Sequence, residues 1–359
     1  MCNLKVLDQS HESHIAVACF LTILAFVFTV ALTFATIEIP RIMSIALVRY
    51  IPDIHPVIEP EAVEAFMKTA RPIGYACLAI VVALIIVGFV TKRKSLSSLG
   101  VVFFFLPTFG YFAASMFFLA GLGILRIMWI PFWEQSINLV NLGDVAYVPY
   151  MIPTYLFALA GLDIRTPFTI AVTGLGFFIF LLGAVAWFCG KTEKRETVTF
   201  WIYKYSRHPQ YLGYIIWSYG VMLQASLTPF PWGGSNPGAG LPWVISSLIV
   251  ICMALDEEIN MSKRDRDTYL KYKERAPFMF PIPKFIASLV TAPIRVLLRK
   301  NQPENRKEII GTFAVYFLIF VLLSLPFILL NFPPDHQWWK WPVWPIGPGP
   351  IFELARSLL

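Results

Sequence analysis

The chain is dominated by long stretches that are almost free of charged side chains. Each is long enough, or nearly so, to cross a hydrocarbon core of ~30 Å as a helix rising ~1.5 Å per residue. These stretches cover residues 15–37, 72–91, 98–125, 167–189, 211–227, 241–256 and 309–331. Hydrophobic residues make up 57% of the 359 positions and charged residues only 14%. The sequence therefore predicts an all-α, polytopic integral membrane protein with about seven transmembrane helices.

The distribution of lysine and arginine predicts the orientation. If the amino terminus and the loops at 92–97, 190–210 and 257–308 share one side, that side holds 21 of the 29 basic residues. The positive-inside rule makes it the cytoplasmic side. Because the basic residues cluster at membrane edges, anionic lipid headgroups explain the net charge of +7 better than nucleic acid does.

Several apolar or amphipathic segments are not expected to span. Residues 61–70 follow Pro60 as a short amphipathic surface helix, and residues 147–162, broken by two prolines, are re-entrant or interfacial. Residues 278–298 are expected to lie in the interface, as is the Trp- and Pro-rich tail after residue 331. We expect three regions. Residues 1–166 form amino-terminal membrane helices of unknown role, residues 167–285 form a second membrane domain that holds most of the polar residues near spans, and residues 286–359 form an interfacial segment with the last helix and the tail.

Some classes of site are not expected. Five cysteines show neither metal-ligand spacing nor a disulfide framework, and no metal is expected. Gly174 and Gly176 lie within an apolar stretch, and no glycine-rich loop follows a predicted strand. A nucleotide-bearing cofactor therefore has to be held by something other than a Rossmann sheet.

Two polar clusters flank the fifth and sixth apolar stretches. Residues 228–240 between these stretches are rich in proline and glycine, which break helices and favour a turn. Two antiparallel helices joined by a turn bring their far ends together. We therefore predict that Arg207 and His208 lie on the same membrane side as Glu257 and Glu258.

The residue types in the two clusters indicate a class of ligand. Arginine can clamp a carboxylate or phosphate, glutamates attract an ammonium, sulfonium or ribose, and tyrosines stack on a base. S-adenosylmethionine carries a carboxylate, an ammonium, a sulfonium and an adenine. It is the cofactor that we expect at this end of the hairpin.

Three blocks in this region resemble a known family. They are Arg207-His-Pro-Gln-Tyr-Leu-Gly213, Glu257-Glu258 and Tyr269-Leu-Lys-Tyr-Lys-Glu-Arg-Ala-Pro277. In this order, and separated by a membrane hairpin, they are similar to the isoprenylcysteine carboxyl methyltransferases and, more loosely, to the phospholipid methyltransferases. The resemblance covers about residues 195–285.

The resemblance implies roles for particular residues. The cofactor-binding residues that it implies are Thr197, Val198, Tyr203, His208, Pro209, Gln210, Tyr211 and Glu257. Arg207, His208 and Glu258 are the predicted catalytic group. An amine acceptor has to lose a proton, and His208 and Glu258 are the available bases. The implied acceptor is lipidic, such as an isoprenylcysteine-like carboxylate or a lipid amine or thiol, and it reaches the site from the surrounding membrane lipid.

Two positions depart from the family pattern. Met253 stands where an arginine is expected to hold the substrate carboxylate, and Arg266 stands where a glycine is usual. The resemblance therefore supports the cofactor more firmly than it supports a prenylcysteine substrate.

Two other functions stay open at this point. A membrane reductase of the sterol type would share a helical plan and a His/Tyr motif but bind NADPH. A non-enzymatic transporter or scaffold would use the same polar residues as headgroup anchors and surface ion pairs.

Overall fold

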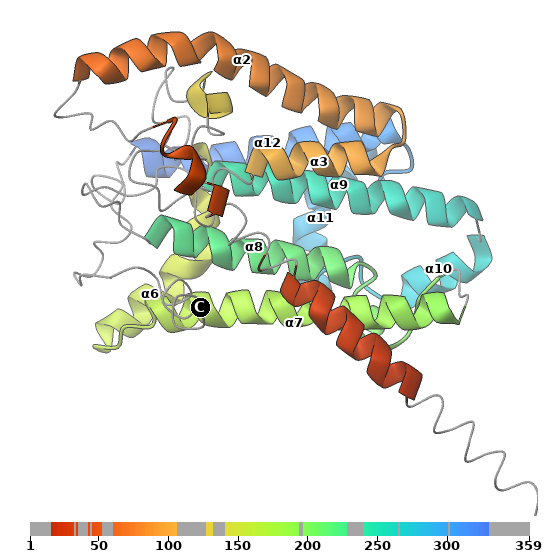
Figure 1. The fold of residues 1–359 in the computed structure, drawn as a ribbon. Helices are drawn as coiled ribbons and strands as arrows, with labels where there is room; N and C mark the ends of the chain where they lie inside the picture. Colours follow the sequence, from red (N-terminus) through yellow and green to blue (C-terminus); the bar gives the residue numbers. More distant parts are fainter. Residues whose placement is uncertain are drawn as a thin grey trace, which may run out of the picture.

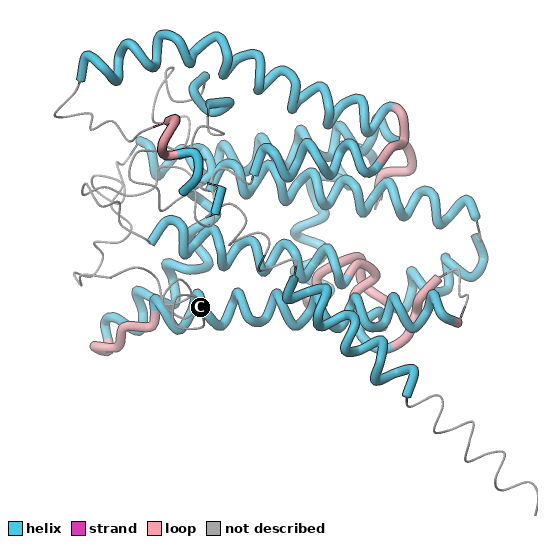
Figure 2. Tube along the Cα trace, in the orientation of Figure 1, coloured by secondary structure: helices cyan, strands magenta, loops and turns pink. Residues whose placement is uncertain are grey.

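A computed structural model provides the fold. It describes residues 16–31, 34, 42–43, 45–51, 60–105, 127–131, 141–193, 197–227, 240–264, 266–300 and 302–329. Figure 2 shows helices joined by loops, and this part of the chain contains no strand. The all-α prediction is therefore confirmed for the described residues.

The elements follow one another along the chain as helices of very different length. A helical run covers Ala16–Ala31. The labelled elements are α2 Pro60–Val90, α3 Lys94–Phe105, η4 Asn141–Tyr147, α6 Val148–Leu159, α7 Arg165–Thr192, η5 Trp201–Lys204, α8 Pro209–Leu227, α9 Gly240–Arg264, α10 Arg266–Arg275, α11 Lys284–Leu298 and α12 Arg306–Leu329.

Four helices in the described part of the chain are long and apolar enough to cross a membrane. They run over Glu61–Val90, Arg165–Thr192, Gly240–Lys263 and Arg306–Pro326. Large apolar side chains face outward from them, for example Ile80 at 60% and Leu318 at 56% exposure. Contiguous exposed apolar surface of this kind is typical of contact with lipid. The chain is a membrane protein on this evidence of length, composition and exposed surface.

The other predicted spans have different outcomes. Ala16–Ala31 is apolar but shorter than a span. The predicted span 98–125 is described only as far as Phe105 at the end of α3. The fifth, 211–227, is helical as α8 over 19 residues but is not among the four, because tyrosine, glycine and glutamine dilute its hydrophobicity. Four candidate spans thus stand where the sequence predicts about seven.

One predicted boundary between elements is wrong. Residues 61–70 were expected to form a separate surface helix, but α2 continues without a break through Pro72 to Val90. Proline removes one backbone donor, and membrane helices tolerate this loss. The polar first turns are therefore an extension of the spanning helix.

Several other predictions concern short or undescribed segments. The 12-residue α6 runs through Pro153, and at ~1.5 Å per residue it is too short to span, as expected for the 147–162 segment. The proline- and glycine-rich turn at 228–239 and the tail after 329 lie outside the described residues.

The helices pack in two groups of neighbours. In Figure 1, α7 and α8 run side by side, while α2, α3, α9 and α12 form the other group. Both α3 and η4 contact α9, so the amino-terminal helices pack directly on the helix that carries the acidic cluster. The short α10 lies beside the end of α9, at the right of Figure 1.

Glycines set the close approach of α7 to α8. A Cβ atom at Gly176 would lie 2.2 Å from the Trp217 backbone nitrogen, and one at Gly213 would lie 2.4 Å from the Phe180 nitrogen. A real Cβ cannot be this near to backbone, so only glycine allows the two helices to touch here. This contact fixes the position of the first turn of α8, where the polar cluster begins.

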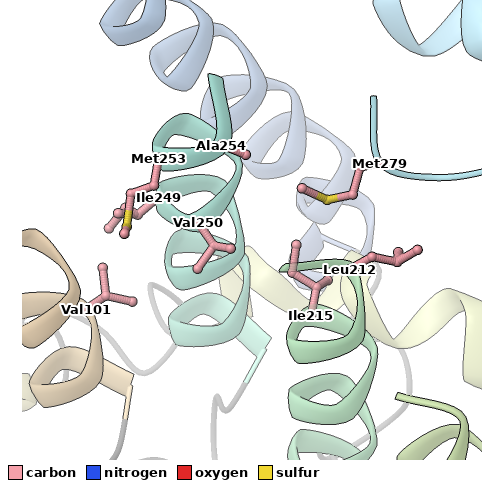
Figure 3. Close-up of a cluster of buried hydrophobic side chains, with 8 residues drawn as sticks. All are labelled: Val101, Leu212, Ile215, Ile249, Val250, Met253, Ala254 and Met279. Atoms are coloured by element: carbon pink, nitrogen blue, oxygen red, sulfur yellow. The ribbon is translucent and has the colours of Figure 1, made fainter. Parts of the chain in front are cut away.

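The core between the two groups is apolar around Met253. Figure 3 shows its neighbours Val101, Ile249 and Val250 together with Leu212 and Ile215 of α8 and Met279. Met253 is 8% exposed. The position at which the family resemblance leads one to expect an arginine is therefore part of the hydrophobic core.

Candidate functional site

Three consecutive acidic residues near the end of α9 face three different parts of the protein. Successive residues of an α-helix are rotated by about 100°, so Asp256, Glu257 and Glu258 cannot share a face. Asp256 contacts Arg306, Glu257 contacts Tyr211, and Glu258 contacts the Arg207–His208 pair. The structure thus confirms that the far ends of the hairpin helices meet, and it separates the two glutamates.

Glu258 forms a buried ion pair with Arg207. The Arg207 Nε donates to Glu258 Oε1 over 2.6 Å, and Nη2 donates to Oε2 over 3.1 Å. The two side chains are 3% and 6% exposed. A buried bidentate pair is strongly destabilised when one partner is lost, because the other charge stays buried without compensation.

Arg207 also closes the end of α10. Its Nη1 donates to the carbonyl oxygens of Lys273 and Ala276 over 3.2 and 2.6 Å. Its backbone N–H donates to the Pro277 carbonyl over 3.0 Å. Basic side chains commonly satisfy the last carbonyls of a helix in this way. The donors of Arg207 are therefore used within the protein, and we interpret Arg207 and Glu258 as positioning residues that join α8, α9 and α10.

His208 and Pro209 form the start of α8. The His208 carbonyl accepts the first intrahelical bond, from the Leu212 N–H, and Pro209 occupies the first helical position. The His208 Nε2 lies 3.3 Å from Glu258 Oε1, and its ring stacks on Tyr211 at a centroid distance of 5.7 Å. His208 is 5% exposed. Its ring is therefore held between the ion pair and an aromatic face.

Glu257 and Tyr211 form the more accessible pair at this end of the hairpin. The Tyr211 hydroxyl donates to Glu257 Oε2 over 3.2 Å. Both residues are half-buried, and so is the neighbouring Gln210. Among the predicted cofactor-binding side chains these three are better placed to meet a ligand than the enclosed His208.

A hydrogen bond between two tyrosines connects η5, the segment that precedes α8, to α10. The Tyr272 hydroxyl donates to the Tyr203 carbonyl over 2.8 Å. Burial, together with Tyr272 and the negative charge of Glu257, raises the pKa of Tyr203. The Tyr203 phenol therefore stays protonated at neutral pH and is a hydrogen-bond donor, not a base.

Thr197 and Val198 lie on the segment between α7 and η5. Val198 is buried against Ala186 and Tyr203, and Thr197 is half-buried. A Cβ at Gly190 would come within 2.4 Å of the Val198 side chain. Val198 thus fills the space between α7 and Tyr203. Thr197 and Val198 therefore lie beside Tyr203, at the edge of the polar cluster.

A second polar contact at this end of the bundle, between Arg306 and Asp256, is not predicted by the sequence. Arg306 Nε donates to Asp256 Oδ1 over 2.9 Å, and its Nη1 donates to the Phe89 carbonyl at the end of α2. The pair joins α12, α9 and α2 at the same end of the bundle as Arg207. Three consecutive acids on one helix point in three directions, which indicates three separate partners. No sequence motif near Asp256 identifies Arg306 as its partner.

The described residues contain no group of three His, Cys, Asp or Glu side chains that could hold a metal ion. No protein-family model matches the chain, and searches of curated proteins and of solved structures likewise gave no match.

Proposed function

We propose that the chain is an integral membrane methyltransferase that uses S-adenosylmethionine and acts on a lipidic acceptor. The observation that supports this most is the meeting of Tyr203, Tyr211 and Glu257 with the Arg207–Glu258 pair at one end of a membrane hairpin. Apart from Tyr203, these residues belong to the first two of the blocks that resemble isoprenylcysteine carboxyl methyltransferases, and they converge although more than forty residues separate those two blocks. Arg207 joins the third block to them through the carbonyl oxygens of Lys273 and Ala276.

The residues at the hairpin end fit the cofactor chemically. Glu257 offers a half-buried carboxylate to an ammonium or to ribose hydroxyls, and Tyr211 offers a phenol and a ring face. When bound, the cofactor supplies a methyl group on a cationic sulfonium. Arg207 is already paired with Glu258, so a different cation has to meet the carboxylate of the cofactor.

The buried contacts of His208 indicate which kind of methyl acceptor the site could use. Its Nε2 is directed at Glu258, and neither group is free to take a proton from a substrate while this contact holds. An acceptor that is already deprotonated at neutral pH, such as a carboxylate, needs no base. The apolar surroundings of Met253 offer such a carboxylate no partner there, so it has to be held elsewhere.

We further propose that the chain is multi-pass and that this end faces the cytoplasm. Most basic residues lie at this end, which the positive-inside rule assigns to the cytoplasmic side. S-adenosylmethionine, a charged soluble molecule, would reach the site from that compartment, and the lipidic acceptor would reach it from the bilayer.

Titration of the full chain in detergent with S-adenosylhomocysteine and, separately, with NADPH tests the proposal. We expect saturable binding of S-adenosylhomocysteine and none of NADPH. Binding of NADPH alone would instead identify a reductase. Binding of neither would favour a scaffold or transporter.

The variant Glu257→Ala sharpens this test. We expect it to lose S-adenosylhomocysteine binding while its thermal unfolding midpoint stays close to that of the wild type, because Glu257 is half-buried and outside the ion pair. Retained affinity in a folded Glu257→Ala protein would show that the ligand site lies elsewhere.

A further inference from the structure

Glu258 also lines a cavity that neither Tyr211 nor Glu257 lines. It has a volume of about 150 Å³ and lies between α9, α10 and the linker that precedes α12. Its polar lining includes Ser262, Lys263, Tyr269, Lys273 and Gln302. At ~30 Å³ per water molecule, it has room for a tetrahedral oxyanion.

The charges around this cavity leave an excess of positive charge. Two acids line it. Glu258 is paired with Arg207 at 2.6 Å, and Glu304 shares Lys300 with Glu308, at 2.6 and 3.3 Å. The ammonium groups of Lys263 and Lys273 make no ion pair with any described carboxylate. Burial lowers the pKa of Lys273, and an ammonium that has lost part of its hydration gains most from an anionic partner.

One buried hydroxyl in the lining lacks a partner. Tyr269 is 2% exposed, and its hydroxyl oxygen makes no hydrogen bond of normal geometry with a described residue, although the Glu258 carboxylate is near enough to interact with it. A buried hydroxyl without a well-aligned partner is destabilising. Burial and the nearby Glu258 charge raise the pKa of Tyr269, so this group is available as a donor to a ligand in the cavity.

We propose that this cavity binds a phosphate group, with Lys263 and Lys273 as its cations and Tyr269 as its neutral donor. Two flexible ammonium groups and a phenol suit the tetrahedral oxygens of a phosphate monoester. The group can come from an anionic lipid headgroup or from a soluble phosphate. This site uses neither Tyr211 nor Glu257, so it stands apart from the proposed methyl transfer.

Calorimetric titration of the full chain in detergent, in a buffer free of phosphate and sulfate, tests the site. The two probes are inorganic phosphate and a water-soluble short-chain phosphatidic acid. We expect saturable binding of at least one of them. Binding of inorganic phosphate assigns a soluble phosphate as the source, and binding of the lipid alone assigns a headgroup.

Three variants and a matched control identify the residues. Lys273→Met, Lys263→Met and Tyr269→Phe should each weaken binding about tenfold, the loss of one hydrogen bond to a charged group. Lys271→Met removes an exposed lysine of the same helix that does not line the cavity, and it should leave the affinity unchanged. No saturable binding of either probe to the wild type would overturn the proposal. Equal weakening in Lys271→Met and Lys273→Met would also overturn it, because it would show diffuse attraction to basic helices.

Discussion

The two adjacent glutamates of α9 should differ widely in how much stability they lose on the same substitution. Glu258→Gln removes the charge that pairs with Arg207 and leaves a guanidinium that is 3% exposed with only neutral carbonyl oxygens as partners. Breaking a buried pair on one side costs about 3–5 kcal/mol, a large part of the ~5–15 kcal/mol that stabilises a typical domain. Glu257→Gln keeps an acceptor for the Tyr211 hydroxyl and should cost no more than about 1 kcal/mol.

Thermal unfolding of the full chain in one detergent, followed by tryptophan fluorescence, compares the two variants. At ~2–4 °C per kcal/mol, Glu258→Gln should lower the midpoint by roughly ten degrees and Glu257→Gln by a few degrees at most. The double variant Arg207→Met/Glu258→Leu removes both charges and should cost less than Glu258→Gln alone. Equal midpoints for the two glutamine variants would refute the positioning role of the pair.

Two further predictions concern packing and pH. Gly176→Ala should destabilise by about 1–3 kcal/mol because its Cβ would meet the backbone of α8, whereas Gly174→Ala, with nothing within 4 Å, should be neutral or slightly stabilising; equal unfolding midpoints would contradict the close contact. Burial raises the pKa of Asp144 to about 8 from 3.8. The folded state therefore holds a proton that the unfolded state has lost, and between about pH 4 and 8 stability should fall with rising pH by up to ~1.4 kcal/mol per pH unit. Asp144→Asn should flatten this dependence, and an unchanged pH profile in that variant would contradict it.

The pairing of the two hairpin ends could be predicted from the sequence because it follows from topology. Two helices joined by a turn must bring their far ends together, and the Arg207 Nε indeed lies 2.6 Å from Glu258 Oε1. The partners of the individual acids could not be predicted. They depend on the rotation of α9 about its axis and on α10 and α12, whose positions no local pattern fixes.

The predicted bounds of the apolar segments differ from the observed helices where composition and geometry differ. Charged residues in the first turns of α2 suggested a separate surface helix, but a helix can leave the membrane without ending, and α2 does so across Pro72. In α8, tyrosine and glycine serve the contact with α7 and the polar cluster, which lowers its apolar character. Met253 departs from the pattern of the family that the sequence resembles, and only the structure shows that its position belongs to the core.

Hydrogen–deuterium exchange of the full chain, with and without S-adenosylhomocysteine, tests the central claim most directly. Slower exchange in peptides covering 203–212 and 255–262, with no change in 148–159 of α6, is the result that we predict. Unchanged exchange in both peptides at a saturating concentration, or protection confined to another part of the chain, would contradict a cofactor site at the end of this hairpin.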